Sequence, residues 1–476
     1  MSQALDRLLA QAHASSGRCE HRLRSHVLAQ LLCLGRHTVT GLLCTTGRLF
    51  GDWSSDYRLY ARQRVDPPAL FAVVRRDVAL RLSTGAPFVA ALDDSVLRKR
   101  GRKIPGSAWR RDPLSPPFAV NWVWGQRVLQ LSALLPLADD GLARALPIDY
   151  LPAPSAVRPR PQAPAEAWEH YRQQQRELNI NLQGRRRVEQ LHAHLQAERP
   201  GEPLWLVVDG RFTNRTMLKN PAPDVSFIGR LRADAKLYRL PTHADRGPRG
   251  GRPRTYGTPL PTPTQIRQDE SFPWQSVRAF AAGRTHAFRV KSLTPLRWRA
   301  TGSHNLRLII IAPLGYRLTQ RGKLLYRRPA YLLCTDPAAP LERVLQAYLW
   351  RWDIEVNFRD EKTVLGVGQA QVRNPHAVQN LPATAVAAYS LLHLAAVHAF
   401  GPLGLPAALP PPAWRRREQP RRAATMKLLN HLRWELWGQA LAQTGFVDFP
   451  TPNPTTHKSQ KPQPNPATSV FYAQTG

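Results

Sequence analysis

The sequence predicts a mixed α/β protein, and three features of its 476 residues support this fold class. Apolar residues recur at helical spacing early in the chain and again after Pro340. Between these parts lie short apolar runs, such as 86–94 and 203–209, which end in acidic residues. Residues 235–338 contain only short strand-like runs and turns. We therefore expect helices packed around a sheet, with a β-rich insertion ahead of the last helices.

Residues 1–82 are predicted to form a helical N-terminal domain. Leu5, Leu8 and Leu9 recur at helical spacing, and Thr38 is placed to cap a helix that continues into Leu42. This pattern fits a small DNA-binding domain with a helix-turn-helix. It fits equally well a helical bundle that only packs against the rest of the chain.

The central sheet is predicted from residues 83–234, with helices from 339–445 completing this core. The expected strands are 86–94, 118–124, 128–135, 203–209 and 227–232. A long polar helix is expected over 165–198. Residues 446–476 are poor in apolar residues, which is typical of a disordered tail.

The charge of the chain points to a polyanionic partner. Lys and Arg number 67 against 33 Asp and Glu, which gives a formal net charge of +34. Most of this excess is Arg, whose guanidinium group matches phosphate and guanine edges with paired hydrogen bonds, so nucleic acid is the favoured partner. The four Cys form no CxxC pair, and a zinc ribbon or disulfide scaffold is therefore not expected.

The sequence gives no sign of secretion, membrane insertion or nucleotide binding. Its first residues contain no uninterrupted apolar stretch of the signal-peptide kind, and no run of about 18 apolar residues predicts a transmembrane helix. A GKS or GKT motif is missing, so no nucleotide cofactor is expected. We predict a cytoplasmic, nucleoid-associated protein.

Two acidic residues at predicted strand ends are candidate metal ligands. Asp94 and Asp209 each follow an apolar strand, and sites are commonly built at strand ends of open sheets. Two carboxylates from neighbouring strands would hold a divalent cation through hard oxygen ligands. The alternative is that each Asp only caps the turn after its strand.

Four residues of the predicted helix after Pro340 share one face. They are Tyr348, Arg351, Glu355 and Lys362. At about 100° per residue, their spacing places all four within about 60° of one another. Such a face sets a carboxylate between two cations and a phenol. The alternative is an ordinary surface row of ion pairs.

This pattern resembles a known family signature. The spacing Y-(2)-R-(3)-E-(6)-K is that of a large group of insertion-sequence transposases with a DDE catalytic core. The segments 92–95 and 206–210 are similar to the first and second Asp motifs of that family. In the first motif we assign the ligand to Asp94, because it precedes the hydroxyl residue Ser95. Strand alternation also predicts that Asp93 turns to the opposite sheet face.

The resemblance implies an RNase H-like fold, in which a mixed sheet carries helices on both faces, and cut-and-paste DNA transposition. Two Mg²⁺ or Mn²⁺ ions would be held around a scissile phosphate by Asp94, Asp209 and Glu355. DNA beside them would be bound by Tyr348, Arg351 and Lys362. The implied partners are double-stranded DNA, as end repeats and as target, and a second copy of the chain in a homodimer on DNA.

Two alternatives share these features. One is an endonuclease of the same fold that cuts DNA without strand transfer. The other is a DNA-binding protein derived from a transposase that has lost catalysis. The presence of all three candidate acids and the full helix face argues against the second alternative.

Three weaker features point to further DNA contacts. Arg98, Lys99 and Arg100 follow the first Asp motif, where a basic loop would meet the DNA backbone; the alternative is a solvated run of charge. Arg232 follows a predicted strand and is placed to face the site. Trp298 lies between two Arg and could stack on an extruded base, or pack as an ordinary sheet residue.

Overall fold

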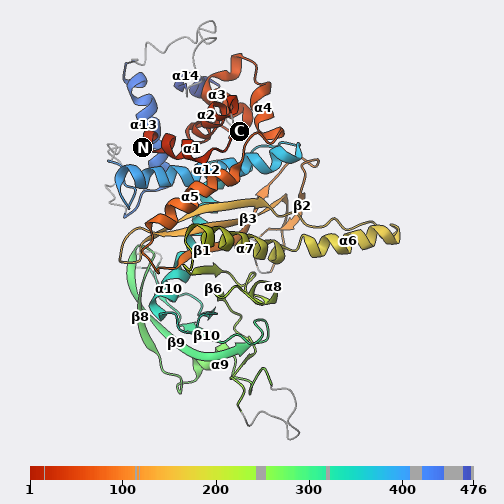
Figure 1. The fold of residues 1–476 in the computed structure, drawn as a ribbon, viewed down its shortest axis with the longest axis vertical. Coiled ribbons are helices and arrows are strands. Elements are labelled where there is room, and N and C mark those ends of the chain that lie inside the picture. Colours follow the sequence, from red (N-terminus) through yellow and green to blue (C-terminus); the bar gives the residue numbers. More distant parts are fainter. Residues whose placement is uncertain are drawn as a thin grey trace.

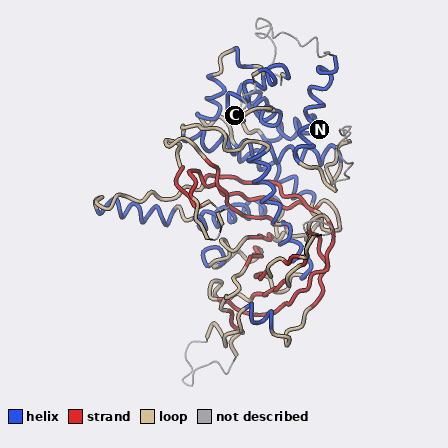
Figure 2. The backbone as a smooth tube through the Cα atoms, turned by 180° about the vertical axis from the view of Figure 1, so that it is seen from behind, coloured by secondary structure: helices blue, strands red, loops and turns tan. Residues whose placement is uncertain are grey.

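The computed structural model describes residues 1–15, 17–112, 115–116, 118–242, 254–317, 322–407, 421–443 and 465–472. Figure 1 shows a helical part at the end that holds the N-terminus, a central sheet, and a strongly curved β part at the other end. Helix α6 (Ala165–Glu177) projects from the body in both Figure 1 and Figure 2.

The chain begins with a run of helices over the residues predicted to form a helical N-terminal domain. The run comprises α1 (Ser2–Ala12), α2 (Arg18–Leu32), α3 (Val39–Thr46), the 3-10 helix η1 (Arg48–Phe50), α4 (Ser54–Ala61) and α5 (Pro67–Arg81). Thr38 caps α3, because its side chain accepts a hydrogen bond from the Gly41 N–H at 3.2 Å. Seven of the eight residues of α3 are buried. In this structure α3 is therefore an internal helix of the N-terminal part.

The far C-terminal part of the described chain lies against α3. Helix α14 (Pro466–Phe471) forms inside the stretch that the composition predicts to be disordered. The backbone N–H of Asn465 donates to the carbonyl of Thr45 at 2.8 Å. This contact with a residue far away in the sequence explains why α14 is ordered, which the local composition does not predict. The remaining tail residues, 446–464 and 473–476, lie outside the described residues.

The central sheet has the strand order β4-β3-β1-β5-β6. The antiparallel neighbours β1 and β3, and β3 and β4, form one half, whereas β1, β5 and β6 run parallel. The strands are β1 (Phe88–Arg98), β3 (Trp122–Pro136), β4 (Ala143–Pro152), β5 (Leu204–Val208) and β6 (Val225–Arg230). A short β2 (Ser107–Arg111) pairs with the first part of β3. This is the RNase H-like arrangement, so the predicted fold class is confirmed.

The β-rich insertion continues the central sheet. Strand β13 (Ala330–Cys334) pairs antiparallel with β6 and extends the sheet to eleven strands. Figure 1 shows the long strands β8 and β9 curving around this end of the molecule. The other elements are β7 (Leu237–Tyr238), α9 (Pro263–Gln268), β8 (Gln275–Ala281), β9 (Arg284–Trp298), β10 (Leu306–Ile311), β11 (Gly315–Tyr316) and β12 (Leu325–Tyr326).

Helices cover both faces of the central strands. Consecutive residues of a strand point to opposite faces, so Leu92 joins the buried cluster that contains Leu191 of α7 (Ile180–Glu198). Its neighbour Ala91 belongs to a second cluster with Ile354. That second face is covered by α10 (Leu341–Trp350) and α11 (Trp352–Thr363).

The predicted single helix over 340–362 is two helices in the structure. They meet at Arg351, whose N–H donates to the Tyr348 carbonyl at 3.2 Å and whose carbonyl accepts from the Ile354 N–H at 3.1 Å. Both bonds span three residues, which is the tighter 3-10 pattern. The expectation of an unbroken helix was wrong at this one residue.

Helix α12 (Pro375–Phe400) passes through the middle of the helical part. Within the described ranges, it is the one helix long and apolar enough to cross a membrane, but 83% of its most apolar window is buried inside the fold. It is followed by α13 (Thr425–Gln443). The burial of α12 marks it as the core helix around which the other helices pack.

Candidate active site

Acidic residues from two neighbouring strands and from α11 lie in one region of the central sheet. Asp93 lies on β1, and Asp209 directly follows β5. These strands run parallel, with Leu92 opposite Val208, so the next residue of each strand lies at the same level. Arg351 connects this pair to the helix, with Nη1 3.3 Å from Asp93 Oδ2 and Nη2 2.8 Å from Glu355 Oε1.

The electrostatics of Asp93 reflect this gathering of acids. Burial and the negative charge of Asp209 raise the pKa of Asp93 to about 7, although the Arg351 guanidinium lowers it in part. The side chain of Asp93 is 16% exposed, whereas that of Glu355 is 37% exposed. Asp93 is therefore the more buried of the two acids that pair with Arg351, and Glu355 is the more exposed.

Asp94 does not take part in this group. Both of its carboxylate oxygens lie 2.7 Å from Nη1 of Arg211. The two Asp do diverge to opposite faces of β1, as alternation requires, but α11 packs on the face of Asp93. The expectation that Asp94 meets Asp209 and Glu355 was wrong. It required α11, which carries Glu355, to pack on the face of β1 to which Asp94 points.

The loop after β5 holds Asp209 in place. Asp209 Oδ1 accepts hydrogen bonds from the backbone N–H groups of Arg211 at 2.9 Å and Phe212 at 3.2 Å. The Arg211 side chain reaches over to Asp94. Asp94 and Arg211 therefore tie this loop to β1 and support the position of Asp209.

The other members of the helix pattern lie along the same side of β1 as Asp93. Lys362 Nζ donates to Ser95 Oγ, and Ser95 shares a face with Asp93 because it lies two residues further along the strand. Burial lowers the pKa of the Lys362 ammonium. Burial also raises the pKa of the Tyr348 phenol, which lies near the cations of Arg351 and Arg230.

The basic loop after β1 divides into exposed and buried cations. Arg98 is exposed and pairs with Asp112 at 2.9 Å, and Arg100 is exposed. Lys99 is buried, and its Nζ donates to the carbonyls of Gly368 at 2.8 Å and Ala370 at 2.9 Å. Burial lowers the pKa of Lys99 to about 8. Lys99 thus links β1 to the segment after α11, and the expectation that it faces DNA was wrong.

Two other predicted contact residues lie away from the carboxylates. The side chain of Arg232 is 84% exposed and pairs with Asp234 at 2.9 Å. It is Arg230, the last residue of β6, that approaches Tyr348. Trp298 lies opposite Leu237 and packs half-buried against the core. This placement matches the alternative of an ordinary sheet residue.

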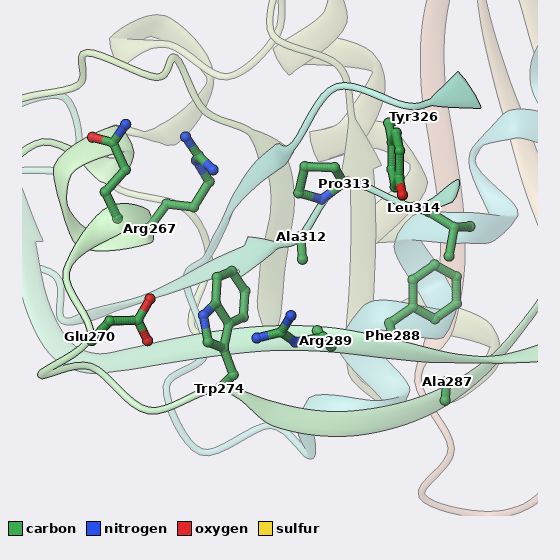
Figure 3. Close-up of a pocket in the computed structure, with 11 residues that line it drawn as sticks. Arg267, Glu270, Trp274, Ala287, Phe288, Arg289, Ala312, Pro313, Leu314 and Tyr326 are labelled. Carbon is green, nitrogen blue, oxygen red and sulfur yellow. The ribbon is translucent and has the colours of Figure 1, made fainter. Parts of the chain in front are cut away.

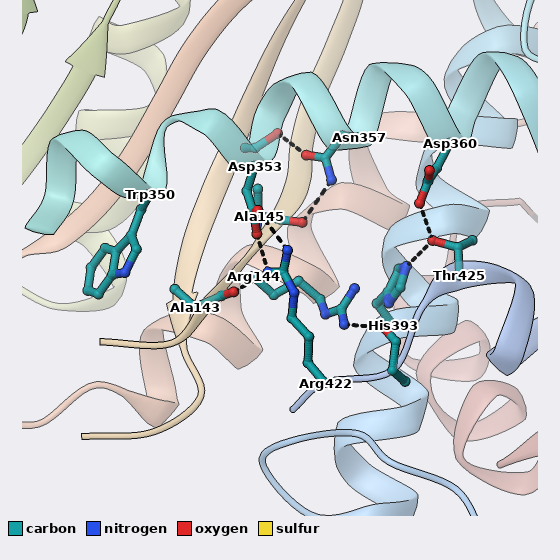
Figure 4. A network of polar contacts seen from close by, with 12 residues as sticks. Ala143, Arg144, Ala145, Trp350, Asp353, Asn357, Asp360, His393, Arg422 and Thr425 are labelled. Atoms are coloured by element: carbon teal, nitrogen blue, oxygen red, sulfur yellow. Dashed lines mark hydrogen bonds and ion pairs between the residues drawn. The ribbon is translucent and has the colours of Figure 1, made fainter. Parts of the chain in front are cut away.

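A network of polar contacts fixes α11, and sequence reasoning missed it (Figure 4). Arg422 Nη2 lies 2.8 Å from Asp353 Oδ1, two residues before Glu355. Asn357 Nδ2 donates to the Ala145 carbonyl at 3.0 Å, and Asp360 accepts from the Thr425 hydroxyl. The sequence feature that could have predicted this network is the spacing of Asp353, Asn357 and Asp360. They are four and three residues apart, so they share one face of the helix.

The carboxylates offer ligands suited to a divalent cation. Oxygen donors of this kind fit Mg²⁺ or Mn²⁺. In the described part of the chain, no group of three or more His, Cys, Asp or Glu is close enough to form a closed metal site. Arg351 lies between two of the acids, because its guanidinium pairs with both Asp93 and Glu355. The donor chemistry fits the cation, and the positive charge between the acids is supplied by Arg351.

A pocket of about 750 Å³ lies elsewhere, in the β-rich insertion (Figure 3). Trp274 and Arg289 lie side by side in it, with the guanidinium carbon 5.1 Å from a ring centroid. Glu270 is the one acid among its described lining residues. The pocket therefore has a different chemistry from the carboxylate site.

The sheet order, with Asp93 in the middle of β1 and Asp209 directly after its parallel neighbour β5, defines an RNase H-like protein with an acidic site. The family model described as DDE superfamily endonuclease matches residues 7–304, more than half of the chain. The chain therefore belongs to the DDE superfamily of endonucleases. The matched residues include Asp93 and Asp209 and end before α11. No protein of curated function matches the sequence.

Membership in this family supports an endonuclease-type enzyme that acts on DNA. DDE endonucleases generally depend on divalent metal ions, which agrees with the carboxylate chemistry of the site.

Proposed function

We propose that this protein is a transposase of the insertion-sequence type that cuts and joins DNA strands through Asp93, Asp209 and Glu355. The observation that carries the proposal is the double pairing of Arg351 with Asp93 and Glu355, next to Asp209. Each acid comes from a different element, so the group depends on the whole fold. The Y-(2)-R-(3)-E-(6)-K pattern on α10 and α11 supports the insertion-sequence assignment.

The proposed chemistry is phosphoryl transfer without a covalent protein intermediate. Two divalent cations would activate water, or later a DNA 3′-hydroxyl, and stabilise the leaving oxygen. The three carboxylates would hold them through oxygen ligands. Arg351, once released from Asp93 and Glu355, would bind a phosphate oxygen of the DNA. Lys362 lies beside Ser95 on the same side of β1 and would neutralise a neighbouring phosphate.

The proposed partners follow from charge and from the family. A net charge of +34 supports binding to double-stranded DNA, both the inverted repeats of the element and the target. Transposition needs two ends in one complex, so we propose a homodimer assembled on DNA, in the cytoplasm and associated with the nucleoid. The exposed side chains of Arg98 and Arg100 are candidate backbone contacts.

An endonuclease without strand transfer is the second candidate function, because the family description names an endonuclease. A cleavage assay distinguishes both candidates from an inactive DNA-binding protein. The substrate is a duplex that carries the element's own end, with Mg²⁺ or Mn²⁺. Cleavage that is lost in Glu355→Gln supports the proposed site, and joining of the cut 3′ end to a second DNA supports transposition. Wild-type cleavage by Glu355→Gln would remove Glu355 from the site.

A further inference from the structure

The hairpin formed by β2 and β3 carries Trp and Arg side chains on one face. Trp109 lies opposite Trp124, and Arg111 lies opposite Trp122. Directly opposed residues of antiparallel strands point to the same face, and so do residues two apart on one strand. These four residues therefore share one side of the hairpin, which we call the Trp–Arg face.

The reverse side of the hairpin is closed by the protein itself. Arg110 is buried, with Nε donating to the Gly125 carbonyl at 3.2 Å and Nη1 donating to Ser155 Oγ at 3.1 Å. On the Trp–Arg face, by contrast, Trp109 is 53% exposed and Trp122 is 61% exposed. Large aromatic rings left this open on one side of a sheet commonly mark a binding surface.

The exposed rings are held in a fixed arrangement. The Trp109 and Trp124 rings meet edge to face, with centroids 5.7 Å apart. The guanidinium of Arg102 lies 5.0 Å from the Trp109 centroid and 4.9 Å from the Trp124 centroid. Trp124 Nε1 donates to the Gly101 carbonyl at 3.1 Å. The Trp109 and Trp124 part of the face is therefore organised before any partner binds, which lowers the entropic cost of binding.

Charge indicates what kind of partner this face would accept. Residues 98–111 contain Arg and Lys at seven positions and no acid, and five of these cations remain once the buried Lys99 and Arg110 are set aside. Aromatic rings interleaved with Arg are the usual platform for unpaired bases, because each base stacks on a ring while its phosphate meets a cation. A base inside a duplex already stacks on its neighbours and has no free face to offer.

The Trp–Arg face also lies on the strand that borders the proposed active site. Asp93 is opposite Gln130 of β3, and the pairing continues without a slip to Arg98 opposite Gly125. By alternation, Gln130, Trp124 and Trp122 are on the same side of β3. The eight residue-to-residue steps from Gln130 to Trp122 span about 27 Å of strand, which is the length of several nucleotides.

We propose that the Trp–Arg face binds unpaired nucleotides of the DNA strand held at the active site. In this proposal, bases stack on Trp109 and Trp122, and Arg111 pairs with the phosphate between them. The inference rests on the proposed function for its choice of DNA and adds a preference for single-stranded segments next to the cut.

The test measures affinity of the full-length protein for two DNAs, a blunt duplex and the same duplex with a ten-nucleotide single-stranded extension. Trp122→Ala is expected to weaken binding of the extended DNA about 5- to 100-fold and to change blunt-duplex binding less than about twofold. Trp434→Ala is the matched control, because Trp434 is 58% exposed on α13, away from the predicted DNA-binding residues. It should change neither affinity.

A fluorescent base analogue in the extension gives a second measurement. The quenching of its fluorescence on binding should be lost in Trp109→Ala and Trp122→Ala, and kept in Trp434→Ala. Equal loss of affinity for both DNAs, or no loss for either, would overturn the proposal. These assays measure binding and do not depend on cleavage. If the protein binds DNA with this preference but does not cleave it, the proposed function is contradicted and the proposal for the Trp–Arg face is still supported.

Discussion

Asp93 and Asp94 are consecutive residues of β1 whose carboxylates pair with different arginines on opposite faces of the sheet. Asp93 meets Arg351 of the α10–α11 joint, and Asp94 meets Arg211 of the loop after β5. The first contact places Asp93 in the acidic group. The second gives Asp94 a supporting role, because the Arg211 backbone N–H also donates to Asp209.

The two acids should therefore differ in their effect on DNA cleavage. Asp93→Asn is expected to reduce cleavage about 10³-fold or more, since it removes a charge from the proposed catalytic group. Asp94→Asn should cost about 10- to 100-fold, as is common for residues that orient a ligand. Rates with Mn²⁺ on an end-bearing duplex check this order, and binding should be retained in both variants. If Asp94→Asn reduced cleavage more than Asp93→Asn, Asp94 rather than Asp93 would be assigned as the metal ligand.

Lys362 and Lys99 allow a paired test of DNA contact. Lys362→Met should reduce the slope of log affinity against log salt by about 0.9, the change for one phosphate contact. Lys99→Met should leave that slope unchanged, because Lys99 Nζ is bound to the Gly368 and Ala370 carbonyls. It should instead lower the free energy of unfolding by about 1–3 kcal/mol, since two buried carbonyls lose their donor. If Lys99→Met reduced the slope of log affinity against log salt, Lys99 would be assigned as a DNA contact.

Glu361 should make stability depend on pH. It is 2% exposed, and burial raises its pKa from 4.5 to about 8. Between these values the folded protein keeps a proton that the unfolded chain has lost, so stability falls as pH rises from about 4.5 to about 8. Glu361→Gln should remove this dependence and add on the order of 3 kcal/mol near pH 8. Urea unfolding at pH 5 and pH 8 checks it, and equal gains at both pH values would contradict the assignment.

The Asp353–Arg422 pair should stabilise α11 as a coupled unit. Asp353→Asn and Arg422→Gln are each expected to cost about 1–3 kcal/mol, less than a fully buried pair because both side chains are partly exposed. The double variant should cost less than the sum of the two. The exposed pair Arg232 and Asp234 is the matched control and should show no measurable coupling. Cleavage should fall with the first pair only, because Asp353 lies two residues from Glu355.

Local patterns in the sequence predicted much of the fold. The strands around Asp209 and the cap at Thr38 depend on residues close together in the chain, and such features can be derived from alternation and capping rules. The RNase H-like fold came from the resemblance carried by the motifs on β1, β5 and the helix after Pro340. The break at Arg351 was missed because it is a single-residue change in hydrogen bonding within an otherwise helical pattern.

The parts of the site that could not be predicted all depend on long-range packing. Whether Asp93 or Asp94 joins the acidic group depends on the face on which α11 docks, more than 250 residues later. The burial of Lys99 depends on carbonyls at Gly368 and Ala370. The Trp–Arg face likewise emerges only from the register of Trp109 with Trp124. No local pattern carries this information.

The pairing of β13 with β6 bears on how this protein could be shortened. The register sets Leu333 opposite Gly229, so the strand that returns from the insertion satisfies the backbone groups of the outermost parallel strand. If the residues between 230 and 340 were deleted, the backbone N–H and C=O groups along that side of β6 would be unpaired. Such an exposed strand edge can pair with a strand of another molecule. Deletion of the insertion is therefore an aggregation risk, and any minimal version would need a replacement strand at this position.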